Sequence, residues 1–283
     1  MAGRRRRDGG GQDLVALVRS GEAGAYEALQ LFRSRCSRLR QKGDFRGAVD
    51  EAARGCMALC PEYEKAGAEL ALALVEVLAE GDLDCSPENL SAVQRVDAAF
   101  PPRSAARIEF LLAAIKWSMR CGSRELGDPA LHGEVAACFW EAGDRAKAVY
   151  HFPAAEAPEQ LWSHLKGAPE EEQTPLFVFA VCQFLAIESI RDAGALLELQ
   201  RKTRKSPAAG IVQFADYLVQ TCKRDAAPLF QALVQAYGPE LERFPVILQL
   251  VMGPIALRYF NLRQQGRPDM MTMLQNALGG GAH

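Results

Sequence analysis

Residues 42–60 read KGDFRGAVDEAARGCMALC, and this stretch decides the fold. Gly43 suits the left-handed backbone conformation that ends a helix, and Asp44 is a residue type that caps the start of the next one. From Phe45 onward, apolar residues recur three, four and seven positions apart, at Ala48, Val49, Ala52, Ala53, Cys56 and Leu59. Such spacing is typical of an α-helix that is buried along one face. The stretch therefore predicts a helix, a tight turn and a second helix.

The same turn, a glycine followed by an acidic residue, recurs at residues 20–22, 42–44, 80–82 and 142–144. In each case we expect the glycine to adopt the left-handed conformation and to end an apolar helical run. No segment alternates apolar and polar residues as a strand would, and the run LALALVEVL at residues 70–78 is interpreted as a helix buried between neighbours. The pattern predicts an all-α protein, an α-solenoid of stacked antiparallel helix pairs with irregular, tetratricopeptide-like repeats.

Looser stretches suggest how the chain is divided. Residues 1–11, MAGRRRRDGGG, are expected to form a disordered, basic and glycine-rich N-terminus. We assign residues 12–152 to an N-terminal helical-repeat half and residues 153–283 to a C-terminal helical half with a flexible, glycine-ended tail. The stretch GAPEEEQTP at residues 167–175 is the best candidate for a join between the halves.

Composition excludes several classes of protein. A net charge of −2 gives no general attraction to nucleic acid or to acidic membranes, and no run approaches the roughly 18 apolar residues of a membrane span. Asp8 and three glycines follow the N-terminal arginines where a signal peptide would be apolar, so a cytosolic protein is expected. The eight cysteines are interpreted as small buried apolar residues, and Cys56 and Cys60, although on one helix face, lack the partners of a metal site.

Catalytic motifs are missing from the sequence. There is no phosphate-binding loop of the G-x-x-x-x-G-K-[ST] type and no G-x-S-x-G nucleophile elbow. Residues 132–134 read HGE, so the H-E-x-x-H zinc helix is absent as well. We therefore expect a protein that is not an enzyme and has no cofactor or metal. If it takes part in an ATP-driven process, another subunit must bind the nucleotide.

Two charged stripes stand out on neighbouring predicted helices. Basic residues crowd one helix and its exit, at Arg33, Arg35, Arg38, Arg40 and Lys42, with no acidic residue between Glu27 and Asp44 to neutralise them. On a later helix, acidic residues recur at Glu62, Glu69 and Glu76, with Glu80 close behind. Either these are ordinary solvated faces, or they orient a protein partner. The C-terminal residues Met270, Met271, Leu274 and Leu278 likewise either fold back on the array or face a partner.

Four segments in order carry a family resemblance. They are YEALQLFR at residues 26–33, IKWS at 115–118, LGDPALH at 126–132 and YHF at 150–152. Together they resemble the Golgi to ER traffic protein 4 family, the adaptor subunit of the guided entry of tail-anchored proteins pathway. The resemblance extends over residues 13–152 and is thinner afterwards. Leu29 stands where the family usually has histidine, and the turn before Tyr26 is longer here.

The resemblance implies an α-solenoid that bridges two partners. Its N-terminal half would bind the targeting ATPase that shuttles tail-anchored membrane proteins to the ER, and its C-terminal half would grip a ubiquitin-like co-chaperone partner. Neither nucleic acid binding nor direct membrane insertion is implied. The positions that match the family's ATPase-binding residues are Tyr26, Glu27, Gln30, Arg33 and Glu69, and Arg38 of the basic stripe is expected to contact the ATPase through its charge.

Two alternatives remain open at the level of sequence. A helical-repeat scaffold of another cytosolic complex, such as a proteasome-lid subunit or a peptide clamp, would have the same helical pattern. A helical-repeat RNA binder would need basic residues once per repeat on one face, and only the helix around Arg33 is strongly basic.

Overall fold

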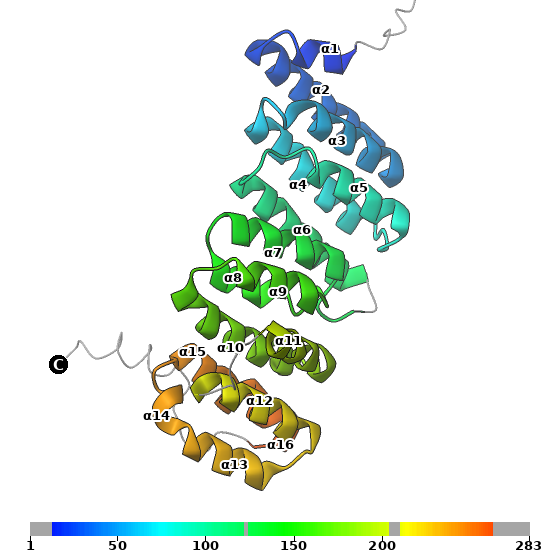
Figure 1. The fold of residues 1–283 in the computed structure, drawn as a ribbon. Coiled ribbons are helices and arrows are strands. Elements are labelled where there is room, and N and C mark those ends of the chain that lie inside the picture. The colour runs from blue at the N-terminus through cyan, green and yellow to red at the C-terminus, as the bar shows by residue number, and fades with distance from the viewer. Residues whose placement is uncertain (1–12, 122–123, 204–209, 263–283) are drawn as a thin grey trace, which may run out of the picture. The chain divides into compact units, whose positions relative to one another are not determined.

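All regular structure in the described part of the chain is helical. The computed structural model describes residues 13–121, 124–203 and 210–262, and the predicted all-α helical-repeat class is confirmed (Figure 1). Contacts within the chain divide it into two compact units, Met1–Ala155 and Glu156–His283, and each is described by itself. The predicted disordered segment 1–11 and the tail with Met270, Met271, Leu274 and Leu278 lie outside the described residues.

The first unit is a stack of helix pairs. Its helices are α1 (Leu14–Val18), α2 (Glu22–Gln41), α3 (Phe45–Leu59), α4 (Glu64–Glu80), α5 (Pro87–Asp97), α6 (Ala105–Cys121), α7 (Pro129–Glu141) and α8 (Arg145–His151). Most helices next to one another in sequence pack against each other, most extensively α2 with α3, α3 with α4, and α7 with α8. Helices α2, α4 and α6 also pack side by side, and α3 contacts α5, so the unit has two layers. The run at residues 70–78 is part of α4, and Leu70, Leu74 and Leu78 are fully buried.

The turn at residues 42–44 has the structure that its sequence predicts. Gly43 is left-handed with φ +76°, and the side chain of Asp44 accepts a hydrogen bond from the Gly47 amide at 3.0 Å. The turn at 142–144 repeats this arrangement, since Gly143 has φ +85° and Asp144 accepts from the Lys147 amide at 3.2 Å. The helix that Asp44 caps then buries its predicted apolar face.

The prediction is wrong at Gly81. Gly81 has φ −77°, and Asp82 takes the left-handed conformation instead, with φ 49°. The glycine is needed there for space, because an added Cβ would lie 2.6 Å from the ring of Phe45. Asp82 does not cap the next helix either, since Ser86 does so by accepting from the Asn89 amide.

A buried pair of histidines joins α7 to α8. Nδ1 of His132 lies 3.0 Å from Nδ1 of His151, and Nε2 of His132 lies 2.8 Å from the carbonyl oxygen of Leu126. A carbonyl only accepts, so His132 donates from Nε2 to Leu126. When both rings are neutral, which their lowered pKa values favour, Nδ1 of His132 accepts from Nδ1 of His151. Burial lowers the pKa of His132, and burial together with the neighbouring His132 ring lowers the pKa of His151 to about 4.

The second unit is built around one helix that is buried on most sides. The unit contains α9 (Pro158–Lys166), α10 (Glu170–Ala186), α11 (Ile190–Thr203), α12 (Gly210–Lys223), α13 (Ala227–Ala236), α14 (Gly238–Leu241), α15 (Pro245–Leu250), the π-helix η1 (Val251–Ile255) and α16 (Ala256–Phe260). Helix α10 packs against α9, α11, α12, α15 and η1, and nearly all of its residues from Phe177 onward are buried.

The stretch 167–175 lies inside this second unit and does not join the two units. Pro169 is the N-cap of α10, and Glu170, Glu171 and Glu172 form its first turn. Acidic residues there are favoured by the helix dipole. Pro175 lies inside the helix, one turn beyond these acids, where it cannot donate the usual backbone hydrogen bond. A composition that suggested a loop is therefore that of a helix N-terminus.

Candidate protein-binding surfaces

Helix α2 presents the predicted ATPase-binding residues to solvent. Its buried residues, Gly24, Ala25, Ala28, Leu29, Phe32 and Cys36, form one face. The predicted ATPase-binding residues lie on the opposite side and are all exposed: Tyr26, Glu27, Gln30, Arg33 and Arg38. The ring of Tyr26 is 66% exposed, which is unusual for a large aromatic side chain. The structure thus brings these five residues onto one open face.

The sixth predicted residue, Glu69, joins this face through an ion pair. Arg33 Nη1 lies 2.9 Å from Glu69 Oε2 on α4, and both side chains are slightly more than half exposed. An exposed pair of this kind contributes only about 0–1 kcal/mol, so it fixes the two side chains more than it stabilises the fold. We call the exposed residues Tyr26, Glu27, Gln30, Arg33, Arg38 and Glu69 the α2/α4 face.

The basic stripe of α2 has more partners than its sequence suggests. In addition to the Arg33 pair, Arg35 lies 3.4 Å from Glu51 on α3, and Arg40 pairs with Glu80 on α4. These partners come from other helices, since α2 itself has no acidic residue close to the stripe. Arg33 pairs with Glu69, and the later Arg40 pairs with the later Glu80. Helices α2 and α4 are therefore parallel, and the basic side chains of one lie next to the acidic side chains of the other.

Some charge on this surface is left over. Within the described ranges Arg38 makes no ion pair, and its Nε donates to the carbonyl oxygen of Ser34 at 3.2 Å. Glu76 is exposed on α4 between Glu69 and Glu80, and among the ion pairs of the described residues it has none. Glu62 precedes α4, which begins at Glu64, so the acidic stripe on the helix consists of Glu69, Glu76 and Glu80. An exposed aromatic ring beside uncompensated charge suits a protein partner.

The second unit has a groove that the sequence did not reveal. It has a volume of about 470 Å³ and lies between α11 and α12, with Gly194, Leu197 and Val219 among its lining residues. The helices are antiparallel, since Arg201 pairs with Asp216 at one end and Lys223 reaches Gly194 at the other. A Cβ on Gly194 would lie 3.3 Å from the amine of Lys223. A glycine inside a helix costs about 1 kcal/mol, and here it leaves part of the groove open.

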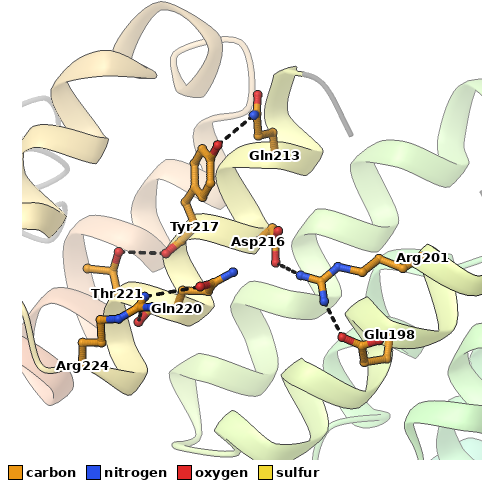
Figure 2. Close-up of polar contacts among 8 residues, drawn as sticks. All are labelled: Glu198, Arg201, Gln213, Asp216, Tyr217, Gln220, Thr221 and Arg224. Carbon is orange, nitrogen blue, oxygen red and sulfur yellow. Dashed lines mark hydrogen bonds and ion pairs between the residues drawn. The ribbon is translucent and has the colours of Figure 1, made fainter. Parts of the chain in front are cut away.

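One end of this α11/α12 groove is closed by three charged side chains that satisfy one another. Figure 2 shows Arg201 between Glu198, on its own helix, and Asp216 on α12, with one guanidinium nitrogen directed to each carboxylate. Among the described residues that line this end, these two carboxylates and one guanidinium sum to one negative charge. Its side chains hold α11 and α12 together.

The other end of the groove is basic. Arg191, Lys223 and Arg224 line it. Arg191 lies 2.8 Å from Asp192, whereas Lys223 and Arg224 have no carboxylate partner among the described residues. Arg224 Nη1 contacts only the backbone carbonyl and side-chain oxygen of Gln220, at 3.4 and 3.3 Å (Figure 2). The groove thus offers apolar surface next to positive charge that no carboxylate of the described residues neutralises.

Neither surface contains a metal site or a membrane segment. In the ranges that the structure describes, no three His, Cys, Asp or Glu side chains gather closely enough to hold a metal ion. In the same ranges no helix has the length and apolar character to cross a bilayer.

Comparisons with known proteins point to a single family. A family model described as Golgi to ER traffic protein 4 matches residues 47–280. The chain is 27% identical to the Golgi to ER traffic protein 4 homolog of Dictyostelium discoideum, over 92% of this chain and 85% of that protein. It is 27% identical to protein GET4 of Arabidopsis thaliana, over 86% and 88% of the two chains.

A solved structure has the same fold. The crystal structure of C. therm. Get4 is similar to this chain with a TM-score of 0.77 at 22% sequence identity, over 95% of this chain and 94% of that one. At this level of identity the likeness concerns the fold.

Proposed function

The chain belongs to the Golgi to ER traffic protein 4 family, and from this premise we propose that it is a non-catalytic adaptor in the targeting of tail-anchored membrane proteins to the ER. The match over residues 47–280 carries this proposal. In the proposed role the chain holds a ubiquitin-like co-chaperone next to the targeting ATPase. It acts in the cytosol and leaves nucleotide hydrolysis to its partner.

We assign the ATPase to the α2/α4 face of the first unit. This assignment is supported by the exposure of all six predicted residues and by the ion pair that links Arg33 to Glu69. Tyr26 offers a rigid apolar anchor, which is the kind of residue that dominates binding at protein interfaces. Arg38, which makes no ion pair within the described ranges, offers charge that a partner's carboxylate would neutralise, so it contributes to the association rate.

We assign the ubiquitin-like partner to the α11/α12 groove of the second unit. The groove favours a segment that places an apolar side chain against Leu197 and Val219 and a carboxylate near Lys223 and Arg224. Its volume of about 470 Å³ suits a short segment more than a whole domain surface. A partner that inserts such a segment would leave the α2/α4 face free for the ATPase.

The adaptor role is tested by assembly of the three purified proteins. Light scattering behind a gel-filtration column should detect one complex that contains the chain, the ATPase and the ubiquitin-like partner. A mixture without this chain should contain no such complex. If the two partners displace one another from the chain, or if they associate equally well without it, the adaptor proposal is wrong.

A further inference from the structure

Two cysteines that are far apart in sequence meet in the first unit. Cys85 lies between α4 and α5, and Cys121 is the last residue of α6. Their sulfur atoms are 2.8 Å apart, and both residues are only partly buried. The sequence predicts small buried apolar cysteines, and Cys85 and Cys121 lie thirty-six positions apart, so no local spacing pairs them.

The surrounding hydrogen bonds hold the two thiols in place. The indole Nε1 of Trp117 donates to the carbonyl oxygen of Leu83 at 3.0 Å, which fixes the segment before Cys85 against α6. The thiol of Cys121 donates to the carbonyl oxygen of Trp117 at 3.3 Å, and that of Cys85 donates to the carbonyl oxygen of Ser118 at 3.7 Å. A disulfide has its sulfur atoms about 2.0 Å apart, so the pair needs to close by less than about 1 Å.

We propose that Cys85 and Cys121 are a site of reversible covalent modification, at which a low-molecular-weight disulfide such as glutathione disulfide converts the two thiols to a protein disulfide. In the first step one cysteine thiolate attacks a sulfur of glutathione disulfide. The disulfide bond of glutathione breaks, one glutathione leaves as a thiol with the proton that the cysteine lost, and a mixed disulfide remains.

The second cysteine completes the exchange. Its thiolate attacks the protein-bound sulfur of the mixed disulfide, the bond to glutathione breaks, and a second glutathione leaves with the second proton. Two protein thiols are thereby oxidised and one glutathione disulfide is reduced to two glutathione thiols. The short distance between Cys85 and Cys121 favours this second step over loss of the mixed disulfide.

A second close pair in the same unit provides a comparison. The sulfur atoms of Cys56 and Cys60 are 3.3 Å apart, but both residues are fully buried and lie one turn apart on α3 and its C-terminal cap. A dissolved disulfide does not reach them without unfolding, so proximity alone does not make them a site. Burial raises the pKa of Cys85 to about 12, which slows the exchange at neutral pH without preventing it.

Mass mapping of the full-length chain tests the proposal. The folded protein is equilibrated with glutathione disulfide, free thiols are blocked with iodoacetamide, and peptides are mapped without reduction. We expect one linked pair of peptides that carry Cys85 and Cys121, whereas Cys56 and Cys60 are recovered as thiols after denaturation. The link closes a long loop, so thermal unfolding should shift upward by roughly 5–10 °C and return after reduction.

Three variants separate the possible outcomes. Cys85→Ser and Cys121→Ser should each abolish the link and the thermal shift, and should leave one glutathione on the remaining cysteine. Cys56→Ala should keep the link. The proposal is overturned if the parent protein carries only separate glutathione adducts, if Cys85 and Cys121 remain unmodified, or if another cysteine is linked in their place.

Discussion

The α2/α4 face and the α11/α12 groove both place arginines and carboxylates between neighbouring helices, but they use them differently. Arg33 of the α2/α4 face, and Arg40 further along α2, both pair with acids of α4. In the groove the only cation held in that way is Arg201, and Lys223 and Arg224 have no carboxylate partner among the described residues. A run of basic residues in sequence therefore says little about binding. What matters is whether the neighbouring helix already neutralises it.

The largest expected effect concerns the stability of the unit that carries the α2/α4 face. His151 has a pKa of about 4 in the folded chain, well below its ordinary value of 6.5. The unfolded chain therefore binds a proton that the folded chain does not, and stability is lost as the pH falls from about 6.5 towards 4. The full loss is at most about 3 kcal/mol for this group.

Denaturant unfolding at neutral pH and at about pH 4.5 measures this loss. His151→Gln removes the titrating ring and should reduce the difference between the two pH values. If His151→Gln loses as much unfolding free energy as the parent between the two pH values, other groups cause the acid sensitivity. Unfolding of the second unit should be measured separately. If its free energy of unfolding falls by the same amount between the two pH values, the loss is not specific to the unit that contains His151.

Filling the groove should produce the next largest effect. Gly194→Leu places a side chain where Lys223 and the partner segment would lie, and should weaken binding of the ubiquitin-like partner by about a hundredfold. Gly194→Ala is the matched control, because its Cβ meets only the flexible end of Lys223. Calorimetric titration measures both affinities, and ATPase binding should not change in either variant. Unchanged affinity in Gly194→Leu would move the partner to another surface.

A smaller effect is expected when charge is reversed on the α2/α4 face. Arg33→Glu combined with Arg38→Glu should slow association with the ATPase by about tenfold, and added salt should slow the parent protein in the same way. Replacement of Arg46 and Arg54 on α3 by glutamate is the control with equal charge change. Stopped-flow association rates decide the matter. If both double variants associate equally slowly, the association rate depends only on the total charge of the chain and not on the α2/α4 face.

The smallest change in affinity is expected at Glu69. Glu69→Lys removes the partner of Arg33, yet binding should stay within a few-fold because the pair is exposed. We expect a change in the turnover of the bound ATPase, measured at saturating adaptor. Glu62→Lys, which alters the same charge ahead of α4, should leave turnover unchanged. If both variants match the parent, Glu69 has no regulatory role, and if both weaken binding equally, the acids act only through their summed charge.

Sequence was sufficient where the structure depends on neighbours along the chain. The conformation of Gly43, the cap by Asp44 and the exposed face of α2 all follow from local spacing. Sequence was insufficient where a residue's role depends on contacts with a different helix. Gly81 is present because Phe45 approaches from another helix, and Glu69 neutralises Arg33 from thirty-six positions away.

The α11/α12 groove belongs to the second kind of feature. A glycine within a helix, at position 194, was a visible signal in the sequence. Its meaning depends on the register that brings Lys223 across it, and no local pattern determines that register. The thiols of Cys85 and Cys121 meet for a similar reason, because packing of the segment before α5 on α6 brings them together.

The three side chains that close one end of the groove also give it a direction. Among the described lining residues, Arg201 is already paired with Glu198 and Asp216, whereas Lys223 and Arg224 at the other end have no carboxylate partner, so an incoming carboxylate is favoured at that other end. A segment that enters with its acidic residues reversed would place them next to Glu198 and Asp216. If the proposed partner binds here, the groove would favour one of the two polarities of the bound segment, and the partner's remaining domains would then lie on one side of it.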